Sequence, residues 1–273
     1  MGWLRRRVYG AAGRILTKPR RNYNLLYPNN LDLLRRALRP GDVILIDGEQ
    51  RVSQVIKYLT QSTWSHSVLY VGDEVLERRP AERDALLSAH GVDAHHMMIE
   101  ALLEQGVTAS PLSKYAEYNL RVCRPIGLRK SDLGLILDEI FAQLGYHYDV
   151  KNILDLGRYF LPVSLIPRRF RRRALAVGSN DSRSVICSSM IGRAFQNVGF
   201  PILPAVSPSQ SDPPALRWWR LLDRLRTHDA RVFHRQRETL ITPRDFDLSP
   251  YFEIVKLRSL EDHKFDYRRI RWA

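Results

Sequence analysis

The chain has 273 residues, with 43 lysines and arginines against 29 aspartates and glutamates, a formal net charge of +14 and a pI of about 10.1. Its two cysteines, Cys123 and Cys187, exclude a disulfide-rich scaffold and favour a reducing compartment. No apolar run reaches the ~18 residues that a membrane-spanning helix needs, so we expect no transmembrane segment. The positive charge favours an anionic partner, either phospholipid or nucleic acid.

The segment from Trp3 to Leu16 has the pattern of a basic amphipathic helix. Its apolar residues recur at helical spacing, and most of its arginines lie on other faces. Such a helix either lies on an anionic membrane or packs against the body of the protein, and both alternatives stay open. No small-residue cleavage site follows, and Arg6 stands where a myristoylation signal has Ser or Thr. The expected location is cytoplasmic, either free or peripheral on a membrane.

The middle of the chain has the apolar runs and turn signals of a sheet. Val43–Ile46, for example, is a continuous apolar run that ends at Asp47-Gly48. The polar stretch 74–94 predicts a loop with at most one helical turn. The predicted strands are 43–46, 64–71, 97–101, 107–109 and 119–124, and the predicted short helices are 31–38, 52–59 and 111–117.

Later segments alternate between helices and irregular chain. Ser131 is expected to cap a helix that runs to Leu144 and ends at Gly145. The apolar and arginine-rich stretch 161–173 either meets an anionic surface or is solvated charge. The remaining predictions are helices at 150–160 and 218–226, an extended segment at 201–214 and a strand at 252–255.

Cys187 stands at the start of a predicted helix. Met190, Ala194 and Val198 follow at helical spacing, and Gly199 provides a stop. Unpaired backbone N–H groups and the helix dipole favour a thiolate at this end of a helix. The alternative is that Cys187 is a small buried apolar residue. Cys123, in contrast, lies in a predicted strand and is expected to be structural.

His66 and Glu100 lie in two predicted strands that precede the cysteine helix. A cysteine nucleophile needs a base within hydrogen-bond reach, and that base needs an acceptor that orients it. Adjacent strands can hold His66 beside Glu100, and a helix packed on the sheet can bring Cys187 to them. Their alternative roles are those of a satisfied strand histidine and an edge-strand carboxylate.

Five short motifs follow one another along the chain. They are Gly41-Asp42-Val43-Ile44-Leu45, Trp64-Ser65-His66-Ser67-Val68-Leu69-Tyr70-Val71-Gly72, Ile99-Glu100-Ala101 with Gly106-Val107, Tyr148-Asp149, and Ile186-Cys187-Ser188-Ser189. In this order they resemble the circularly permuted NlpC-type cysteine hydrolases of the YiiX/YaeF group, papain-like domains to which lecithin:retinol acyltransferase is distantly similar. The resemblance covers roughly residues 40–200.

The resemblance implies an α+β, circularly permuted papain-like (NlpC-type) fold, in which an antiparallel sheet packs against the cysteine-bearing helix. It also implies Cys187 as nucleophile, His66 as general base and acid, and Glu100 as the group that orients the imidazole. Tyr148, Tyr146 and Ser188 are the expected substrate-binding residues. No metal or other cofactor is expected, because adjacent histidines such as His95 and His96 point to opposite faces of a strand.

The resulting prediction is a cysteine hydrolase or acyltransferase that acts on an amide or ester bond through a thioester. Peptide-like and lipid acyl substrates compete, and the basic amphipathic segments favour a lipid or membrane-proximal one. The rival class is a non-catalytic module that binds membranes or nucleic acid; the chain has no recognised nucleic-acid motif, so that partner is unlikely. The expected organisation is a basic extension at 1–39, a catalytic domain at 40–204 with an insert at 155–183, and a C-terminal extension at 205–273 that packs on the domain.

Overall fold

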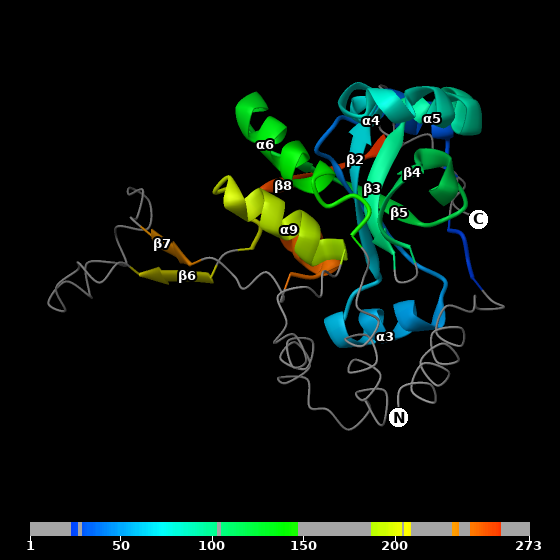
Figure 1. The fold of residues 1–273 in the computed structure, drawn as a ribbon. Coiled ribbons are helices and arrows are strands. Elements are labelled where there is room, and N and C mark those ends of the chain that lie inside the picture. Colours follow the sequence, from blue (N-terminus) through cyan, green and yellow to red (C-terminus); the bar gives the residue numbers. More distant parts are fainter. Residues whose placement is uncertain are drawn as a thin grey trace, which may run out of the picture.

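Figure 1 shows the computed structural model of the protein, which describes residues 23–26, 29–102, 105–146, 187–203, 205–208, 231–234 and 241–257. Several segments with sequence-based expectations lie outside the described residues, among them 3–16, 150–160, 161–173 and 218–226.

A six-stranded antiparallel sheet forms the centre of the protein, with its strands in the order β4-β3-β2-β1-β5-β8. The strands predicted in the middle section all form, because their apolar runs are buried between layers on both faces of the sheet. The strands are β1 (Val43–Ile46), β2 (His66–Gly72), β3 (Met97–Leu102), β4 (Gly106–Pro111), β5 (Leu120–Pro125) and β8 (Phe252–Val255).

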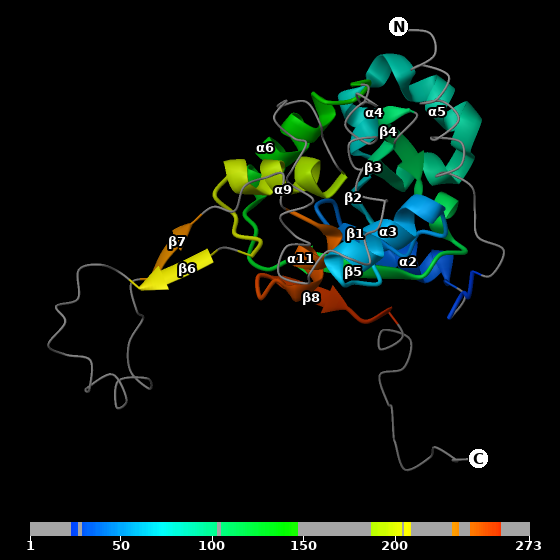
Figure 2. The ribbon, with the colours of Figure 1, turned by 90° about the horizontal axis from the view of Figure 1, so that it is seen from below.

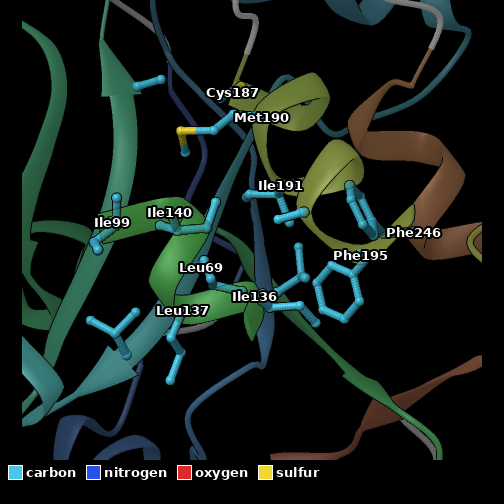
Figure 3. Close-up of a cluster of buried hydrophobic side chains, with 14 of the residues drawn as sticks. Leu69, Ile99, Ile136, Leu137, Ile140, Cys187, Met190, Ile191, Phe195 and Phe246 are labelled. Atoms are coloured by element: carbon cyan, nitrogen blue, oxygen red, sulfur yellow. The ribbon is translucent and has the colours of Figure 1, made fainter. Parts of the chain in front are cut away.

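One face of the sheet carries the two longest helices of the described core, α6 (Lys130–Phe141) and α9 (Cys187–Asn197), which lie side by side (Figure 1). Apolar residues at helical spacing on α9 meet strand residues such as Leu69 and Ile99, and Phe246 closes the cluster (Figure 3). The opposite face is covered by α2 (Leu31–Ala37) and by the short 3-10 helix η3 (Leu112–Tyr115). The fold is therefore a mixed helix and antiparallel-sheet fold of the α+β class.

Helix α6 begins two residues earlier than expected, and its first turn is not capped by Ser131. Its N-cap is Arg129, whose side chain makes no capping bond, and the Ser131 hydroxyl bonds to the neighbouring Asp132 carboxylate instead. The remaining helix in the middle section, α3 (Arg51–Thr60), lies where the sequence predicts it. Residues 205–208 and 231–234 pair as the two-stranded sheet of β6 and β7 (Figure 2).

The stretch 74–94 was expected to be a loop, but it is mostly helical. It contains α4 (Glu74–Arg78), η1 (Pro80–Glu82), α5 (Arg83–His90) and η2 (Gly91–His95). The periodic apolar signal is weak here because α5 buries none of its residues completely. Polar contacts help to hold the segment instead: Arg78 bonds to Glu74 one turn away and to Asp138 on α6.

Part of the segment expected as a C-terminal extension belongs to the domain itself. Strand β8 pairs with β5 at the edge of the sheet, and helix α11 (Pro243–Leu248) buries Phe246 in the main core. Thr242 and Asp245 form a capping box that starts α11, with proline at its first position. That pattern was a sequence signal for a helix.

Gly192 allows α9 to approach Ile241 closely. A Cβ at this position would lie 2.5 Å from Cδ1 and 2.9 Å from Cγ2 of Ile241. Because both branches of the isoleucine are close, rotation cannot relieve the overlap. We expect Gly192→Ala to lower the free energy of unfolding by about 1–3 kcal/mol, despite the better helix propensity of alanine.

Denaturant unfolding measures this change, and Gly134→Ala in α6 is the matched control. No atom lies within 4 Å of a Cβ at Gly134, so that variant should gain about 0.5–1 kcal/mol. Equal effects of the two substitutions would contradict the role assigned to the close approach.

Candidate functional site

Cys187 is the first residue of α9, and the packing of this helix fixes its position. Met190 and Ile191 anchor the helix in the core beside the cysteine, and α9 contacts both β2 and β3 (Figure 3). The Cys187 side chain is 7% exposed. The thiol therefore lies at the N-terminal end of a helix, where backbone N–H groups and the helix dipole stabilise negative charge.

His66 is the first residue of β2, and α9 approaches this end of the strand. Side chains alternate along β2, so Ser67 lies on the face that α9 covers and His66 on the opposite face. The ring nitrogen Nε2 of His66 lies 2.9 Å from Oε2 of Glu100. This contact leaves Nδ1 as the ring nitrogen for Cys187, with which His66 also hydrogen-bonds.

Glu100 is fully buried on β3, yet it remains charged. The pairing of Leu69 with Ile99 places Glu100 on the same face of the sheet as His66. Burial opposes its charge, but hydrogen bonds and charge attraction to His66 and Lys114 outweigh burial and lower the pKa of Glu100 to about 2. Tyr115 donates a further hydrogen bond to Oε2 at 2.5 Å. His66 therefore has an anionic acceptor at neutral pH.

The electrostatics of the site favour a thiolate and an imidazolium. Burial opposes both charges, but their mutual attraction and hydrogen bond prevail, with help from Glu100 on the side of His66. These interactions raise the pKa of His66 to about 10 and lower the pKa of Cys187 below its ordinary value. The backbone N–H of Ser67 also lowers the pKa of Cys187. This arrangement can supply a nucleophilic sulfur and a proton donor together.

The structure thus brings Cys187, His66 and Glu100 together. The residues expected to bind substrate either make other contacts or lie outside the described residues. The Ser188 hydroxyl is fully buried and donates to the Ile241 carbonyl at 2.7 Å, so it is committed to the core. Tyr146 is 66% exposed, and its backbone hydrogen-bonds to the backbone of Val107 and Gln143. Tyr148 lies outside the described residues.

Three residues of the site were missed by sequence reasoning. Lys114 and Tyr115 fall in the segment predicted as a helix, where nothing in their spacing points to a carboxylate 14 residues earlier. Ser67 was quoted only as part of the histidine motif. Strand alternation could have placed its side chain on the face opposite His66, but not beside Cys187.

The other titratable residues singled out in the sequence have separate environments. Cys123 is fully buried in β5, where desolvation and the nearby charge of Asp247 raise its pKa to about 12. His96 hydrogen-bonds through Nδ1 to the Tyr70 hydroxyl at 2.9 Å. Within the described ranges, no group of three or more His, Cys, Asp and Glu side chains is arranged to hold a metal ion. None of the helices in those ranges is long and apolar enough to cross a membrane.

Comparison with known proteins finds distant structural likeness but no related sequence. No protein-family model matches the sequence, and no curated protein matches it. Among solved structures, the chain is similar to the crystal structure of the metalloprotein yiiX from Escherichia coli O157:H7, with 16% sequence identity and a TM-score of 0.44. The alignment covers 80% of this chain and 96% of that one.

Proposed function

We propose that the protein is a cysteine-dependent hydrolase or acyltransferase of amide or ester bonds, built on a circularly permuted papain-like fold. One observation carries the proposal: Cys187 at a helix N-terminus is hydrogen-bonded to His66, which is in turn bound to the buried Glu100 carboxylate. The order of the chain supports the permutation, because the histidine strand precedes the cysteine helix. This arrangement meets the requirements for a base-activated nucleophile.

The first half of the reaction forms a thioester. The Cys187 thiolate attacks the carbonyl carbon, the new C–S bond forms, and the carbonyl electrons move to oxygen. Backbone N–H groups in the first turn of α9 are available to stabilise this oxyanion. When the tetrahedral intermediate collapses, the C–N or C–O bond breaks and the His66 imidazolium gives its proton to the leaving group.

The second half returns the enzyme to its starting state. Neutral His66 takes a proton from water, or from an acceptor alcohol or amine, as this nucleophile attacks the thioester. The C–S bond breaks, and the sulfur leaves as the thiolate beside the re-formed imidazolium. Glu100 accepts the Nε2 hydrogen bond throughout and keeps Nδ1 directed at the sulfur.

Mass spectrometry of the intact protein can test the thioester directly. With activated acyl esters of several chain lengths, we expect a mass increase equal to one acyl group, located on Cys187. Hydroxylamine cleaves thioesters and should remove the adduct. An adduct that resists hydroxylamine, or that forms equally on His66→Ala, would count against acyl transfer by this site.

The substrate class is proposed from sequence, because the basic amphipathic stretches 3–16 and 161–173 lie outside the described residues. Both pair apolar residues with arginines, which suits a lipid acyl or other membrane-proximal substrate better than a soluble peptide. Comparing acyl esters in vesicles with peptide-like amides in solution, at equal concentration, distinguishes these two classes.

We also propose that the protein binds anionic membrane surfaces. Residues 168–173 contain five arginines, and each basic residue near an anionic leaflet contributes on the order of 1 kcal/mol. We expect cosedimentation with vesicles that contain phosphatidylserine, and loss of most of this binding when salt is raised. Glutamine at all five arginine positions should weaken binding, whereas equal binding to neutral vesicles at low salt would overturn the proposal.

A further inference from the structure

Both oxygens of the buried Glu100 carboxylate accept hydrogen bonds from residues other than His66. Lys114 donates from Nζ to Oε1 at 2.5 Å, and Tyr115 donates from its hydroxyl to Oε2 at 2.5 Å. His66 completes the set at 2.9 Å from Oε2. Since the Glu100 side chain is 0% exposed, water is not available to replace any of these donors. The position and rotation of the carboxylate therefore depend on Lys114 and Tyr115.

Lys114 and Tyr115 reach this carboxylate because the chain turns back after β4. Glu100 pairs with Thr108 in the ladder of β3 and β4, and the Leu112 N–H then bonds to the His96 carbonyl as η3 begins. Helix η3 crosses the face of the sheet that carries His66. Lys114 is held there as well, with Nζ 5.2 Å from the centre of the Tyr115 ring.

The charges of the site balance only when Lys114 is included. The titratable groups of the site come from β2, β3 and η3. His66 and Tyr115 interact electrostatically with Cys187, and Glu100, which contacts His66, forms an ion pair with Lys114. With Cys187 as thiolate and His66 as imidazolium, the site carries two negative and two positive charges, because burial and Glu100 raise the pKa of Tyr115 and keep it neutral. Without Lys114, the same buried site carries a net charge of −1.

We propose that Lys114 and Tyr115 are positioning residues of this site. Tyr115 fixes the Glu100 oxygen that accepts the hydrogen bond from His66. The positive charge of Lys114 stabilises the thiolate of Cys187. The catalytic consequence rests on the proposed function. The effect on the thiolate does not, because it is a property of the folded protein without substrate.

The test is the pH dependence of Cys187 alkylation by iodoacetamide, which reports the thiolate and needs no substrate. We expect Lys114→Met to move the midpoint of thiolate formation upward by about one pH unit, a tenfold change in the acid constant. Lys114→Arg keeps the charge and should restore the wild-type midpoint. A lysine with a purely structural role would change stability and leave the midpoint in place.

Tyr115→Phe removes only the hydroxyl that donates to Glu100. Tyr118→Phe is its matched control, because the Tyr118 hydroxyl also donates to a glutamate, Glu49, at 2.9 Å. We expect faster exchange of the His66 Nε2 proton with solvent, followed by NMR, in Tyr115→Phe alone. An unshifted midpoint in Lys114→Met, or equal exchange in the two tyrosine variants, would overturn this inference. If the wild-type protein forms no thioester but its midpoint still responds to Lys114, only the proposed function fails.

Discussion

We expect Cys187→Ala to abolish labelling by a thiol-reactive acyl probe, and Cys123→Ala to leave labelling at the wild-type rate. The two cysteines differ in environment: Cys187 lies beside His66 at a helix N-terminus, whereas desolvation raises the pKa of Cys123 to about 12. With that pKa, only about 10⁻⁵ of Cys123 is thiolate at pH 7, and the thiolate is the reactive form. Gel fluorescence at short reaction times measures both rates.

A denatured sample provides the control, because unfolding removes both environments. In denaturant at high pH, each single-cysteine variant should label equally through its remaining thiol. Equal labelling of the two folded variants would show that position in the fold does not set reactivity, and the assignment of Cys187 as nucleophile would then be wrong.

The second large effect is expected for Glu100→Gln. The amide is nearly the same size, but it lacks the charge that helps to raise the pKa of His66 to about 10. We expect that pKa to fall towards the ordinary value of 6.5, so the imidazolium is lost at lower pH than in the wild-type protein. Acyl transfer near pH 8 should fall by about 10–30-fold, because only about 3% of a general acid with a pKa of 6.5 stays protonated at that pH.

The direction of the pH change is specific to this mechanism. Thiolate and imidazolium coexist in the wild-type protein between the lowered pKa of Cys187 and the raised pKa of His66, so the rate should fall again as pH rises through about 10. In Glu100→Gln this alkaline limit should move downward, as measured by the pH profile of thioester formation and by NMR titration of His66. An alkaline limit that stays near pH 10 would contradict the role of Glu100.

Asp245→Asn is the matched control for Glu100→Gln, because it neutralises a different buried carboxylate, in the cap of α11. Asp245 is fully buried and accepts hydrogen bonds from the backbone and hydroxyl of Thr242 at 2.8 and 3.0 Å. We expect this variant to lose stability through the α11 cap while the alkaline limit of the reaction stays unchanged. If activity is lost only because the protein is less stable, both Glu100→Gln and Asp245→Asn should lose activity.

The sequence alone was sufficient to predict the strands of the core and the cysteine helix. Burial of continuous or periodic apolar runs is a local property, so Val43–Ile46 and the stripe on α9 could be read directly. The pattern of residues around Cys187 also predicted that it lies at the N-terminal end of its helix. The helices at 74–94 were missed because polar pairs stabilise them where apolar periodicity is weak.

The contacts of the polar groups were decided by tertiary structure. Lys114 and Tyr115 meet Glu100 only because the chain reverses after β4, and Ser188 turns to Ile241 because α11 and β8 fold back onto the sheet. Residue spacing carries no information about such contacts, because strand register and chain reversals between distant segments set them. The sequence therefore determined which elements form and where Cys187 starts its helix, and only the packed structure decided which side chains hold His66 and Glu100 in place.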